Sequence, residues 1–490
     1  MKAWLNWLLA ALAGILLVLT FPKFNFVLLA PCALTPLLIA VARERRILPR
    51  LGLGYLTGLI YWWGVNYWIQ FVLDVHGGTG PTLGWLVFGL FCLAKALHMA
   101  AFALLAGWII RVPWAALAVP ALWVAIEWTH GPLGFAWLDL GNAGIDMGIP
   151  LRLAPVTGVY GLSFLFALMS TALALPILRR SRWQIAPLLL IYVLFLLPPL
   201  PDPQHGQATA ILVQPNISDD TIWNPATFEA AVQRLQLLST FAARDAKRQP
   251  DLLVWPEIPA PFYENTPEMA QEARFAGEND HTYFLAGVVG RAPDGAPLNS
   301  AELWSPQGIE LSRYDKVNLV PFGEFVPWPL GYLAHKISTE AGDFEPGKRV
   351  VVSQENGHRI GTFICYESVF PVFIRQFVLQ GAEALFNLSN DSWFGHSAAR
   401  YQHLEIVRMR AAENRRWILR STNDGITAAI DPAGRIKREG PSYQAVSERV
   451  DFSYLNGTTF YTRWGDWFVA VCAVLAAASL FFAVRQFSAV

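Results

Sequence analysis

The chain has 490 residues, of which 54% are hydrophobic and only 15% charged, and it contains 20 Trp. This composition is too apolar for an ordinary soluble protein of that length and favours a membrane protein. The formal net charge is zero. The chain therefore lacks the basic excess that is typical of nucleic-acid-binding proteins, and no nucleic-acid partner is expected.

Apolar runs of about 20 residues, the length that crosses a bilayer as a helix, divide the chain first. Eight of them predict transmembrane helices, near 3–20, 26–42, 52–72, 82–110, 112–128, 153–178, 184–200 and 465–485. The first run continues into the second through "LTFPKFNF" without a small-residue cleavage site, which favours a membrane helix over a signal peptide. Seven helices are thus expected before a long polar segment and one after it.

Arginine and lysine collect in alternate loops between these runs. The loops with "VARERRILPR" (41–50), Arg111 and "RRSR" (179–182) carry the positive charge, whereas "DVHGGTGPT" (74–82) has none. Because basic loops stay in the cytoplasm, both termini are predicted to be cytoplasmic. The segment after the seventh helix is predicted to be extracytoplasmic.

Between 204 and 455 the composition becomes that of a soluble domain. Six short runs predict buried strands: "ATAILVQPNI", "DLLVWPE", "TYFLAGVVG", "RIGTFICYE", "EALFNLSND" and "RWILRSTND". Residues 226–248 and 400–415 have helical spacing, and "ITAAIDPAGRIKRE" predicts a hairpin that turns at Pro432–Gly434. Strands alternating with helices predict a layered α/β domain with two helical outer layers.

The predicted organisation therefore has three parts. Residues 1–203 form a transmembrane domain of seven helices, 204–455 an extracytoplasmic α/β domain, and 456–490 a C-terminal transmembrane helix. The expected fold class is a membrane α-helical bundle plus an α/β domain.

Three polar residues lie at or near the ends of apolar strands, where α/β folds usually build their sites. Glu257 closes "LLVWPE", Lys316 lies in "SRYDKVNLVPFGEFVP", and Cys365 closes "GTFIC" before a turn into the helix-like "VFPVFIRQFVL". A helix N-terminus favours the thiolate form of a cysteine, a carboxylate can take the thiol proton, and an ammonium can stabilise an oxyanion. Such a set is suited to acyl transfer.

A structural interpretation of the same residues stays open. A buried cysteine at a strand end is more often structural than catalytic, and a Glu or Lys there is usually a solvated terminus or half of an ion pair. Against this, Cys365 is the only cysteine between 204 and 455, whereas Cys32, Cys92 and Cys472 lie in apolar runs.

The residues around this set carry a family resemblance. In chain order, "LLVWPE", "YDKVNLVPFGEFVP", "GTFICYES" and "NLSNDSWFG" resemble the motifs of the nitrilase (carbon–nitrogen hydrolase) superfamily. That superfamily has a Glu–Lys–Cys triad on an αββα sandwich, so the resemblance implies this fold. Membrane runs on both sides, "FPKFNF" and "VQPNI" narrow the resemblance to membrane-bound members that acylate bacterial lipoproteins. It covers essentially the whole chain.

The resemblance implies a role for each residue of the set. Cys365 would be the nucleophile, Glu257 the general base, and Lys316 the cation that stabilises the oxyanion. Glu324 in "PFGEF" matches the additional glutamate that the family keeps beside the triad. The amide N–H of Tyr366 would also contribute to the oxyanion hole.

Further residues are candidates for support or substrate binding. Tyr366 and Glu367 follow the nucleophile as they do in the acyltransferases, and Trp223 matches a tryptophan of the family's lipid-facing site. Without the resemblance, Trp223 would be an ordinary surface aromatic. Trp393 and Phe394, in "NDSWFGHS", are predicted to form a mobile flap that touches acyl chains, with a rigid turn as the alternative.

The resemblance also implies the reaction and its setting. The acyl donor would be a phospholipid, preferably the sn-1 chain of phosphatidylethanolamine, and the acceptor the α-amine of the diacylglyceryl-cysteine of an apolipoprotein. A thioester on Cys365 would link the two half-reactions, so no cofactor is needed. The enzyme would lie in the bacterial inner membrane with its catalytic domain outside the cytoplasm. The nine histidines are scattered and form no H-E-x-x-H motif, which argues against a metal.

Two other functions remain open at the level of sequence. A membrane-anchored amidase or nitrilase would pass the acyl group to water, and release of free fatty acid or ammonia without acceptor acylation would identify it. A transporter or scaffold would have lost the activity, and its function would survive a Cys365→Ala substitution.

Overall fold

A computed structural model describes residues 3–202, 206–244, 249–264, 266–280, 282–321, 323–325 and 344–488. The chain divides into two compact units. The first contains Met1–Gln70, Pro81–Leu200 and Trp464–Val490, and the second contains Phe71–Gly80 and Pro201–Arg463. The helix near the C-terminus thus belongs to the same unit as the N-terminal helices.

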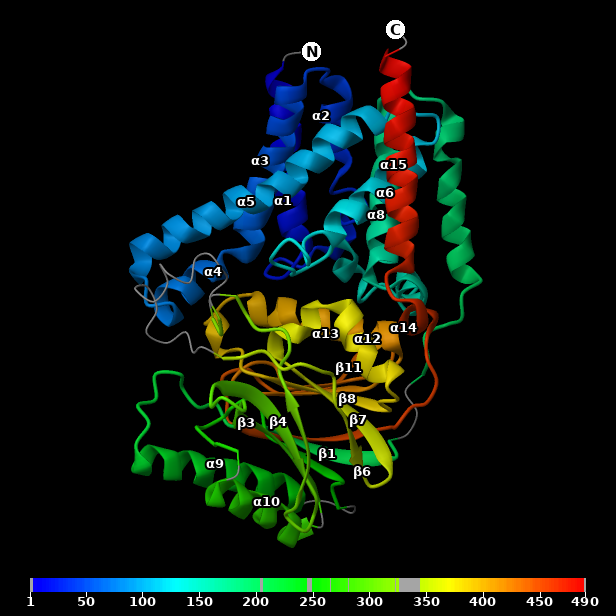
Figure 1. Cartoon of the computed structure of the whole chain (residues 1–490). Helices are drawn as coiled ribbons and strands as arrows, with labels where there is room; N and C mark the ends of the chain where they lie inside the picture. The colour runs from blue at the N-terminus through cyan, green and yellow to red at the C-terminus, as the bar shows by residue number, and fades with distance from the viewer. Residues whose placement is uncertain are drawn as a thin grey trace. The chain divides into compact units, whose positions relative to one another are not determined.

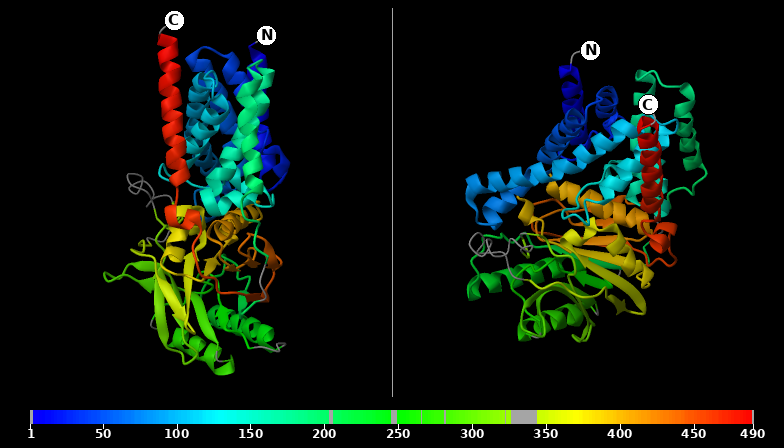
Figure 2. Two further views of the ribbon diagram at one scale, coloured as in Figure 1. Left: turned by 90° about the vertical axis from the view of Figure 1, so that its right-hand side faces the viewer. Right: turned by 45° about the horizontal axis from the view of Figure 1, so that its top comes forward.

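Helices make up the first unit (Figure 1). They are α1 (Trp4–Thr20), η1 (Val27–Leu29), α2 (Thr35–Arg43), α3 (Ile47–Asn66), α4 (Trp68–Phe71), α5 (Gly80–Ile109), α6 (Ala115–Trp128), η3 (Leu140–Gly144), η4 (Pro150–Leu153), α7 (Ala154–Thr157), α8 (Val159–Ile177), η5 (Arg182–Phe195) and α15 (Trp467–Ser488). In both Figures 1 and 2, α1 begins and α15 ends at the same end of this unit.

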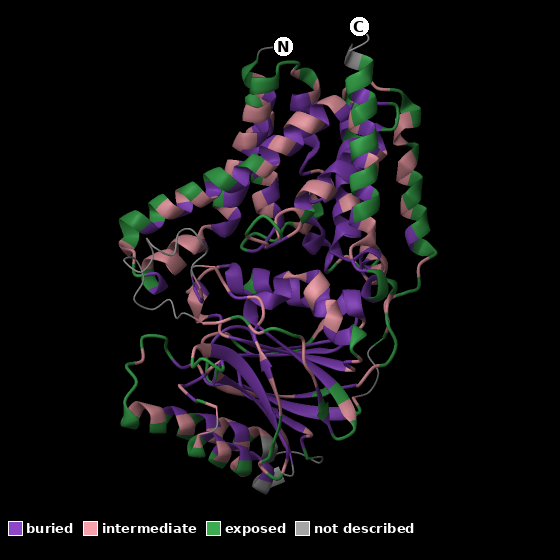
Figure 3. Cartoon of the chain, in the orientation of Figure 1, coloured by how far each residue is buried: buried purple, intermediate pink, exposed green. Residues whose placement is uncertain are grey.

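Three described helices are long and apolar enough to cross a membrane: α5, α8 and the Trp467–Gln486 part of α15. Shorter apolar helices are α1, α6 and η5. Much of α15 is exposed (Figure 3). Its exposed side chains include the apolar residues Val471, Val474 and Phe481. An apolar surface of this kind is suited to contact with lipid.

The second predicted run, 26–42, differs from expectation. It contains the short η1 and then the nine-residue α2, which is shorter than a bilayer crossing. Pro31 and Pro36 lack the amide N–H that a continuous helix would use, and Pro36 lies in the first turn of α2. The number of crossing helices stays a prediction.

The second unit is built from two six-stranded sheets with helices outside them. One sheet has the order β12-β1-β2-β3-β4-β5 and the other β11-β10-β9-β8-β7-β6. The strands are β1 (Ala208–Gln214), β2 (Leu252–Val254), β3 (Tyr283–Arg291), β4 (Pro297–Trp304), β5 (Glu310–Asp315), β6 (Val352–Glu355), β7 (His358–Ile364), β8 (Ala384–Ser389), β9 (Ile418–Thr422), β10 (Ala428–Ile430), β11 (Ile436–Glu439) and β12 (Val446–Phe452).

Helices cover each sheet on its outer face. Figures 1 and 2 show α9 (Pro225–Arg244) and α10 (Pro267–Asp280) beyond the first sheet. The helices α12 (Pro371–Leu379) and α13 (Ala399–Asn414) pack on the second sheet. Within the described residues, the remaining helical segments are η2 (Val72–His76), η6 (Cys365–Val369), η7 (Ser392–Phe394) and α14 (Phe460–Trp464). The predicted α/β domain with two helical outer layers is confirmed.

All six predicted strands are present, and β10 pairs with β11 as the predicted hairpin. The predicted helix over 226–248 is α9, and 245–248 lie outside the described residues. Four strands were not predicted: β4, β5, β6 and β12. The sequences of β5 and β12 are largely polar, and β12 pairs antiparallel with β1, from which it is distant in sequence. Such pairing leaves no local signal.

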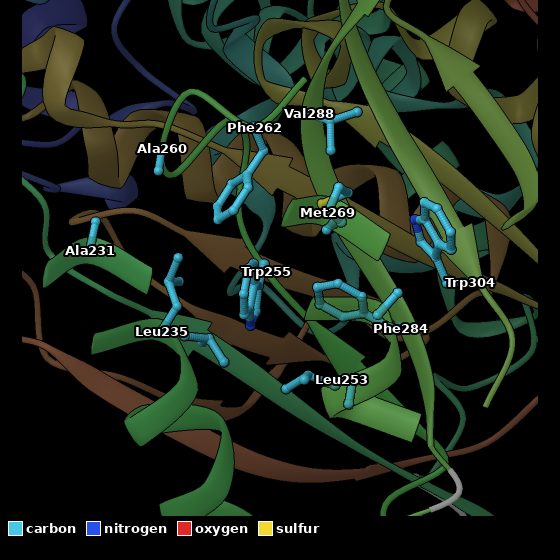
Figure 4. Packing of buried hydrophobic residues seen from close by; sticks show 14 of the residues in the cluster. Ala231, Leu235, Leu253, Trp255, Ala260, Phe262, Met269, Phe284, Val288 and Trp304 are labelled. Atoms are coloured by element: carbon cyan, nitrogen blue, oxygen red, sulfur yellow. The ribbon is translucent and has the colours of Figure 1, made fainter. Parts of the chain in front are cut away.

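A cluster of buried hydrophobic residues includes Trp255, the residue that follows β2 (Figure 4). Trp255 packs against Phe284 with ring centroids 4.8 Å apart and against Phe262 at 5.6 Å. Its indole N–H donates to the hydroxyl of Ser239 on α9 over 3.0 Å. Because Trp255 lies two residues before Glu257, this packing fixes the segment that carries the predicted base.

Candidate active site

Glu257, Lys316 and Cys365 all follow strand ends and are all buried. Glu257 comes three residues after β2, Lys316 directly follows β5, and Cys365 directly follows β7. Two of the residues therefore belong to the first sheet and one to the second. The charges of Glu257 and Lys316 both act on the Cys365 thiol, so the fold brings the three predicted residues together.

Two carboxylates share the Lys316 ammonium. Its Nζ lies 3.2 Å from Oε1 of Glu257 and 2.8 Å from Oε1 of Glu324. The side-chain amide of Asn299, on β4, donates to the same two oxygens over 2.8 and 2.7 Å. The predicted additional glutamate is thus part of one buried polar network with the base and the lysine.

Backbone groups fix the outer oxygens of both glutamates. The N–H of Asn390 donates to Oε2 of Glu257 over 2.8 Å, and the N–H of Val320 donates to Oε2 of Glu324 over 2.8 Å. The segment of Glu257 also lies unusually close to β3, because a Cβ at Gly287 would collide with the carbonyl oxygen of Pro256. Glycine at this position permits the close approach.

Burial and neighbouring charges set the protonation of this network. Burial raises the pKa of Glu257, the Lys316 charge opposes the rise, and Glu324 adds to it. Burial alone would lower the pKa of Lys316, but attraction from Glu257 and Glu324 outweighs burial and raises it. Lys316 is therefore an ammonium at neutral pH, beside a glutamate with a raised proton affinity. This combination suits a general base next to a fixed cation.

Cys365 is held in a strained backbone conformation. Its φ of +50° is in the left-handed region, which residues other than glycine rarely adopt. Burial raises the pKa of its thiol, Glu257 adds to the rise, and Lys316 opposes it. The prediction that a helix N-terminus favours the thiolate is wrong for this state. The 3₁₀ segment η6 intervenes, and α12 begins only at Pro371, whereas the helix dipole acts within about one turn.

The Glu367 carboxylate accepts hydrogen bonds from the segments at the ends of β5 and β7. Its Oε1 accepts from the Tyr314 hydroxyl at 2.6 Å and from the N–H groups of Val317 and Asn318 at 2.8 and 3.1 Å. Its Oε2 accepts from the N–H of Ile364 at 2.8 Å. One carboxyl group therefore joins the loop after β5, which carries the lysine, to the end of β7, which carries the cysteine. Burial raises the pKa of Glu367 to about 7.

The aromatic candidates lie in different surroundings. Tyr366 is buried with its ring edge-on to Phe370, whereas Trp223 is 39% exposed in the segment before α9. Phe394 is buried and contacts the ring of His403 edge-on, with centroids 5.9 Å apart. Trp393 packs against the ring of His76 at 4.5 Å. The predicted mobility of Trp393 and Phe394 stays a prediction.

A second buried network, which the sequence motifs did not indicate, contacts the backbone of Cys365. Asp391 pairs with Arg420, with Nη2 to Oδ2 at 2.6 Å, and its Oδ1 lies 3.1 Å from Nδ1 of His403. The Nε2 of His403 lies 3.1 Å from the carbonyl oxygen of Cys365. A charged residue inside "ILRST", where both faces are buried, was a signal that Arg420 must have a partner. Among the described residues, no group of His, Cys, Asp and Glu could hold a metal ion.

Comparison with known proteins gives a family match for each of the two main parts of the chain. Residues 209–452 match the carbon-nitrogen hydrolase family, and residues 13–172 match the apolipoprotein N-acyltransferase N-terminal domain. The apolipoprotein N-acyltransferase of Geobacter metallireducens is 34% identical over an alignment 508 positions long, which covers 98% of this chain and 96% of that protein. The chain belongs to the apolipoprotein N-acyltransferase family. The apolipoprotein N-acyltransferase of Pseudomonas putida is 32% identical, and the alignment covers 96% of each chain.

Both parts of this chain thus have counterparts in apolipoprotein N-acyltransferases. The family resemblance seen in the sequence is confirmed. A solved amidase from Nesterenkonia sp. is similar over 53% of this chain and 94% of its own, with 19% identity and a TM-score of 0.37.

Proposed function

We propose that this chain transfers an acyl group from a phospholipid to the α-amine of the diacylglyceryl-cysteine at the N-terminus of an apolipoprotein. The donor would be the sn-1 chain of phosphatidylethanolamine. The observation that carries the proposal is that Glu257 and Glu324 both form ion pairs with Lys316, close enough for the charges of Glu257 and Lys316 to act on the Cys365 thiol. Family membership over nearly the full chain supports the acceptor.

In the first half-reaction Glu257 takes the thiol proton of Cys365 while the sulfur attacks the ester carbonyl of the lipid. The raised pKa of the thiol means that this transfer has to accompany attack. Lys316 and the amide N–H of Tyr366 stabilise the oxyanion. The tetrahedral intermediate collapses, Glu257 returns the proton to the leaving alkoxide, and a lysophospholipid departs. An acyl thioester remains on Cys365.

In the second half-reaction the α-amine of the apolipoprotein attacks the thioester carbonyl. Glu257 removes a proton from the incoming nitrogen, the same donors stabilise the second oxyanion, and the C–S bond breaks. The products are an amide and the free thiol, which is protonated again. A thioester is less stable than an amide, so the step needs no nucleotide. Trp393, Phe394 and Trp223 would contact acyl chains and keep water from the intermediate.

The predicted setting completes the proposal. Residues 1–203 and 456–490 would embed the enzyme in the bacterial inner membrane, and residues 204–455 would carry out the reaction outside the cytoplasm. The basic loops around 41–50 and 179–182 support cytoplasmic termini. The lipid substrate would then arrive from the outer leaflet of the same membrane.

Intact mass spectrometry tests the first half-reaction directly. The purified protein is mixed with phosphatidylethanolamine without acceptor, beside the Cys365→Ala variant. An acyl-sized mass gain that is absent from the variant, removed by hydroxylamine and transferred to a diacylglyceryl peptide is expected. An acyl-enzyme that only releases fatty acid would identify the hydrolase alternative, and no adduct in either protein would refute an acyl carrier at Cys365.

A further inference from the structure

One peptide group at the nucleophile is held from another element of the fold. The carbonyl oxygen of Cys365 lies 3.1 Å from Nε2 of His403, on α13. The same Nε2 lies 3.0 Å from the hydroxyl of Ser368. His403 is completely buried, as is most of α13 (Figure 3). The ring thus has a fixed orientation against the strained turn that carries the thiol.

The chemistry of the contact requires a proton on Nε2. A carbonyl oxygen only accepts, so a hydrogen bond to Cys365 needs an Nε2–H on His403. Burial and the Arg420 charge lower the pKa of His403 against the attraction of Asp391. A ring whose pKa is depressed is neutral at pH 7 and carries one proton.

The opposite side of the ring offers Nδ1 both a donor and an acceptor. Nδ1 of His403 lies 3.2 Å from Nη2 of Arg420, a group that only donates, and 3.1 Å from Oδ1 of Asp391. Asp391 already accepts from Arg420 with both oxygens, at 2.7 and 2.6 Å, and from the Ser389 hydroxyl at 3.0 Å. The positioning role uses the tautomer with the proton on Nε2, in which Nδ1 accepts from Arg420 and Nε2 donates to Cys365.

Because the peptide group is planar, the contact between His403 and the Cys365 carbonyl also orients the N–H of Tyr366, the proposed oxyanion donor. In a trans peptide the C=O and N–H lie in one plane and point in opposite directions. Holding the carbonyl of Cys365 therefore fixes the direction of the N–H of Tyr366. A non-glycine residue keeps a left-handed φ only where its surroundings enforce it, and the His403 contact is one such restraint.

We propose that His403 is a positioning residue that aims the Tyr366 amide at the oxyanion by holding the Cys365 carbonyl. The inference rests on the proposed acyl transfer at Cys365. His403 does not touch the substrate, so its loss changes stabilisation of the tetrahedral intermediate and leaves lipid binding unchanged. The reactivity of the thiol towards reagents that form no oxyanion is also unchanged.

Two substitutions separate this role from a packing role. His403→Gln places an amide N–H at the distance of Nε2 and keeps the bond to the Cys365 carbonyl. His403→Asn is shorter and reaches Asp391 but not that carbonyl. His358→Gln is the matched control, because His358 begins β7, the strand that Cys365 follows, and is an accessible residue paired with Glu383.

Acyl-enzyme formation is measured by intact mass with phosphatidylethanolamine and with p-nitrophenyl butyrate. Alkylation of Cys365 by iodoacetamide, read by peptide mapping, reports thiol reactivity without an oxyanion. His403→Asn is expected to acylate roughly 10- to 100-fold more slowly with KM nearly unchanged, somewhat less than the loss of a whole oxyanion donor. His403→Gln and the control should stay within about threefold of the wild type, and alkylation should be unchanged in all of them.

Acylation at the wild-type rate in His403→Asn overturns the proposal, as does a His403→Gln variant that is equally slow. Parallel loss of alkylation and acylation would show a purely structural role and would also refute it. If the asparagine variant does not fold, His403→Met, which fills the space without a donor, takes its place. A wild-type protein acylated by the p-nitrophenyl ester but not by phospholipid would refute the proposed donor alone and leave the His403 comparison intact.

Discussion

Glu324 lies closer to Lys316 than the predicted general base does: its Oε1 is 2.8 Å from Nζ, compared with 3.2 Å for Glu257. It supplies the nearer of the two negative charges that keep a completely buried lysine protonated. The N–H of Val320 holds its other oxygen, so the charge is fixed in place. Removal of one partner from a buried ion network of this kind leaves a charge that is no longer fully compensated.

Removing this charge should slow the first half-reaction. In Glu324→Gln the ammonium keeps a single counter-charge and pairs more closely with Glu257, which becomes a weaker base. We expect thioester formation to slow roughly 10- to 100-fold with phospholipid binding retained. The rate of the acyl-sized mass gain measures it. Glu310→Gln, at the exposed start of β5, is the control, and a wild-type rate in Glu324→Gln would contradict the assigned role.

Asn299 should be intolerant of a change that removes its donor. In Asn299→Asp three carboxylates would surround one ammonium, and the oxygens of Glu257 and Glu324 would lose the amide that now serves both. We expect a loss of stability of about 1–3 kcal/mol, from an unsatisfied buried group, and a loss of acylation. Thermal unfolding and acyl-enzyme mass measure the two effects. Asn356→Asp, in the exposed turn before β7, should change neither, and equal effects of both substitutions would refute the prediction.

Stability should fall with rising pH because of Glu355, on β6. Burial raises the pKa of this carboxyl to about 7, whereas an unfolded glutamate titrates near about 4.3. A raised folded pKa means that the contribution to stability is complete below about pH 4.3 and is lost as the pH rises through 7. Glu355→Gln should therefore flatten the pH dependence of Tm between about pH 5 and 8, by an equivalent of at most about 3 kcal/mol. A curve parallel to that of the wild type would contradict the assignment.

Trp393 should affect substrate affinity more than chemistry. Its ring packs on His76 and lies near Gly323, beside Glu324, but makes none of the hydrogen bonds described at the thiol. We expect Trp393→Ala to raise KM for phospholipid roughly 5- to 10-fold, as for loss of one buried aromatic contact, with kcat within about twofold. Steady-state kinetics measure both constants. A fall in kcat at constant KM would instead place Trp393 in the catalytic network.

Much of the fold was predictable because its signals are local. The six apolar strands, the hairpin at Pro432–Gly434 and the helices α9 and α13 follow from short patterns of side chains. The strand β12 was missed because its partner β1 is distant in sequence, whereas β4, β5 and β6 pair antiparallel with strands that are adjacent along the chain. Their own sequences contain little continuous apolar character.

By itself the sequence determined which residues could carry the chemistry. The order of the motifs identified Glu257, Lys316, Cys365 and Glu324, since each lies in a short segment whose sequence resembles a motif of the nitrilase superfamily. It also determined that much of the chain is suited to a membrane. These features depend on neighbouring residues along the chain.

Only the tertiary structure decided how those residues behave. Burial raises the pKa of the Cys365 thiol, and no local pattern encodes that burial. Asn390 reaches Glu257 across 133 residues of sequence, and His403 reaches Cys365 from α13. Hydrogen bonds and pKa values depend on distances of a few ångströms between segments, and the folded packing alone sets those distances.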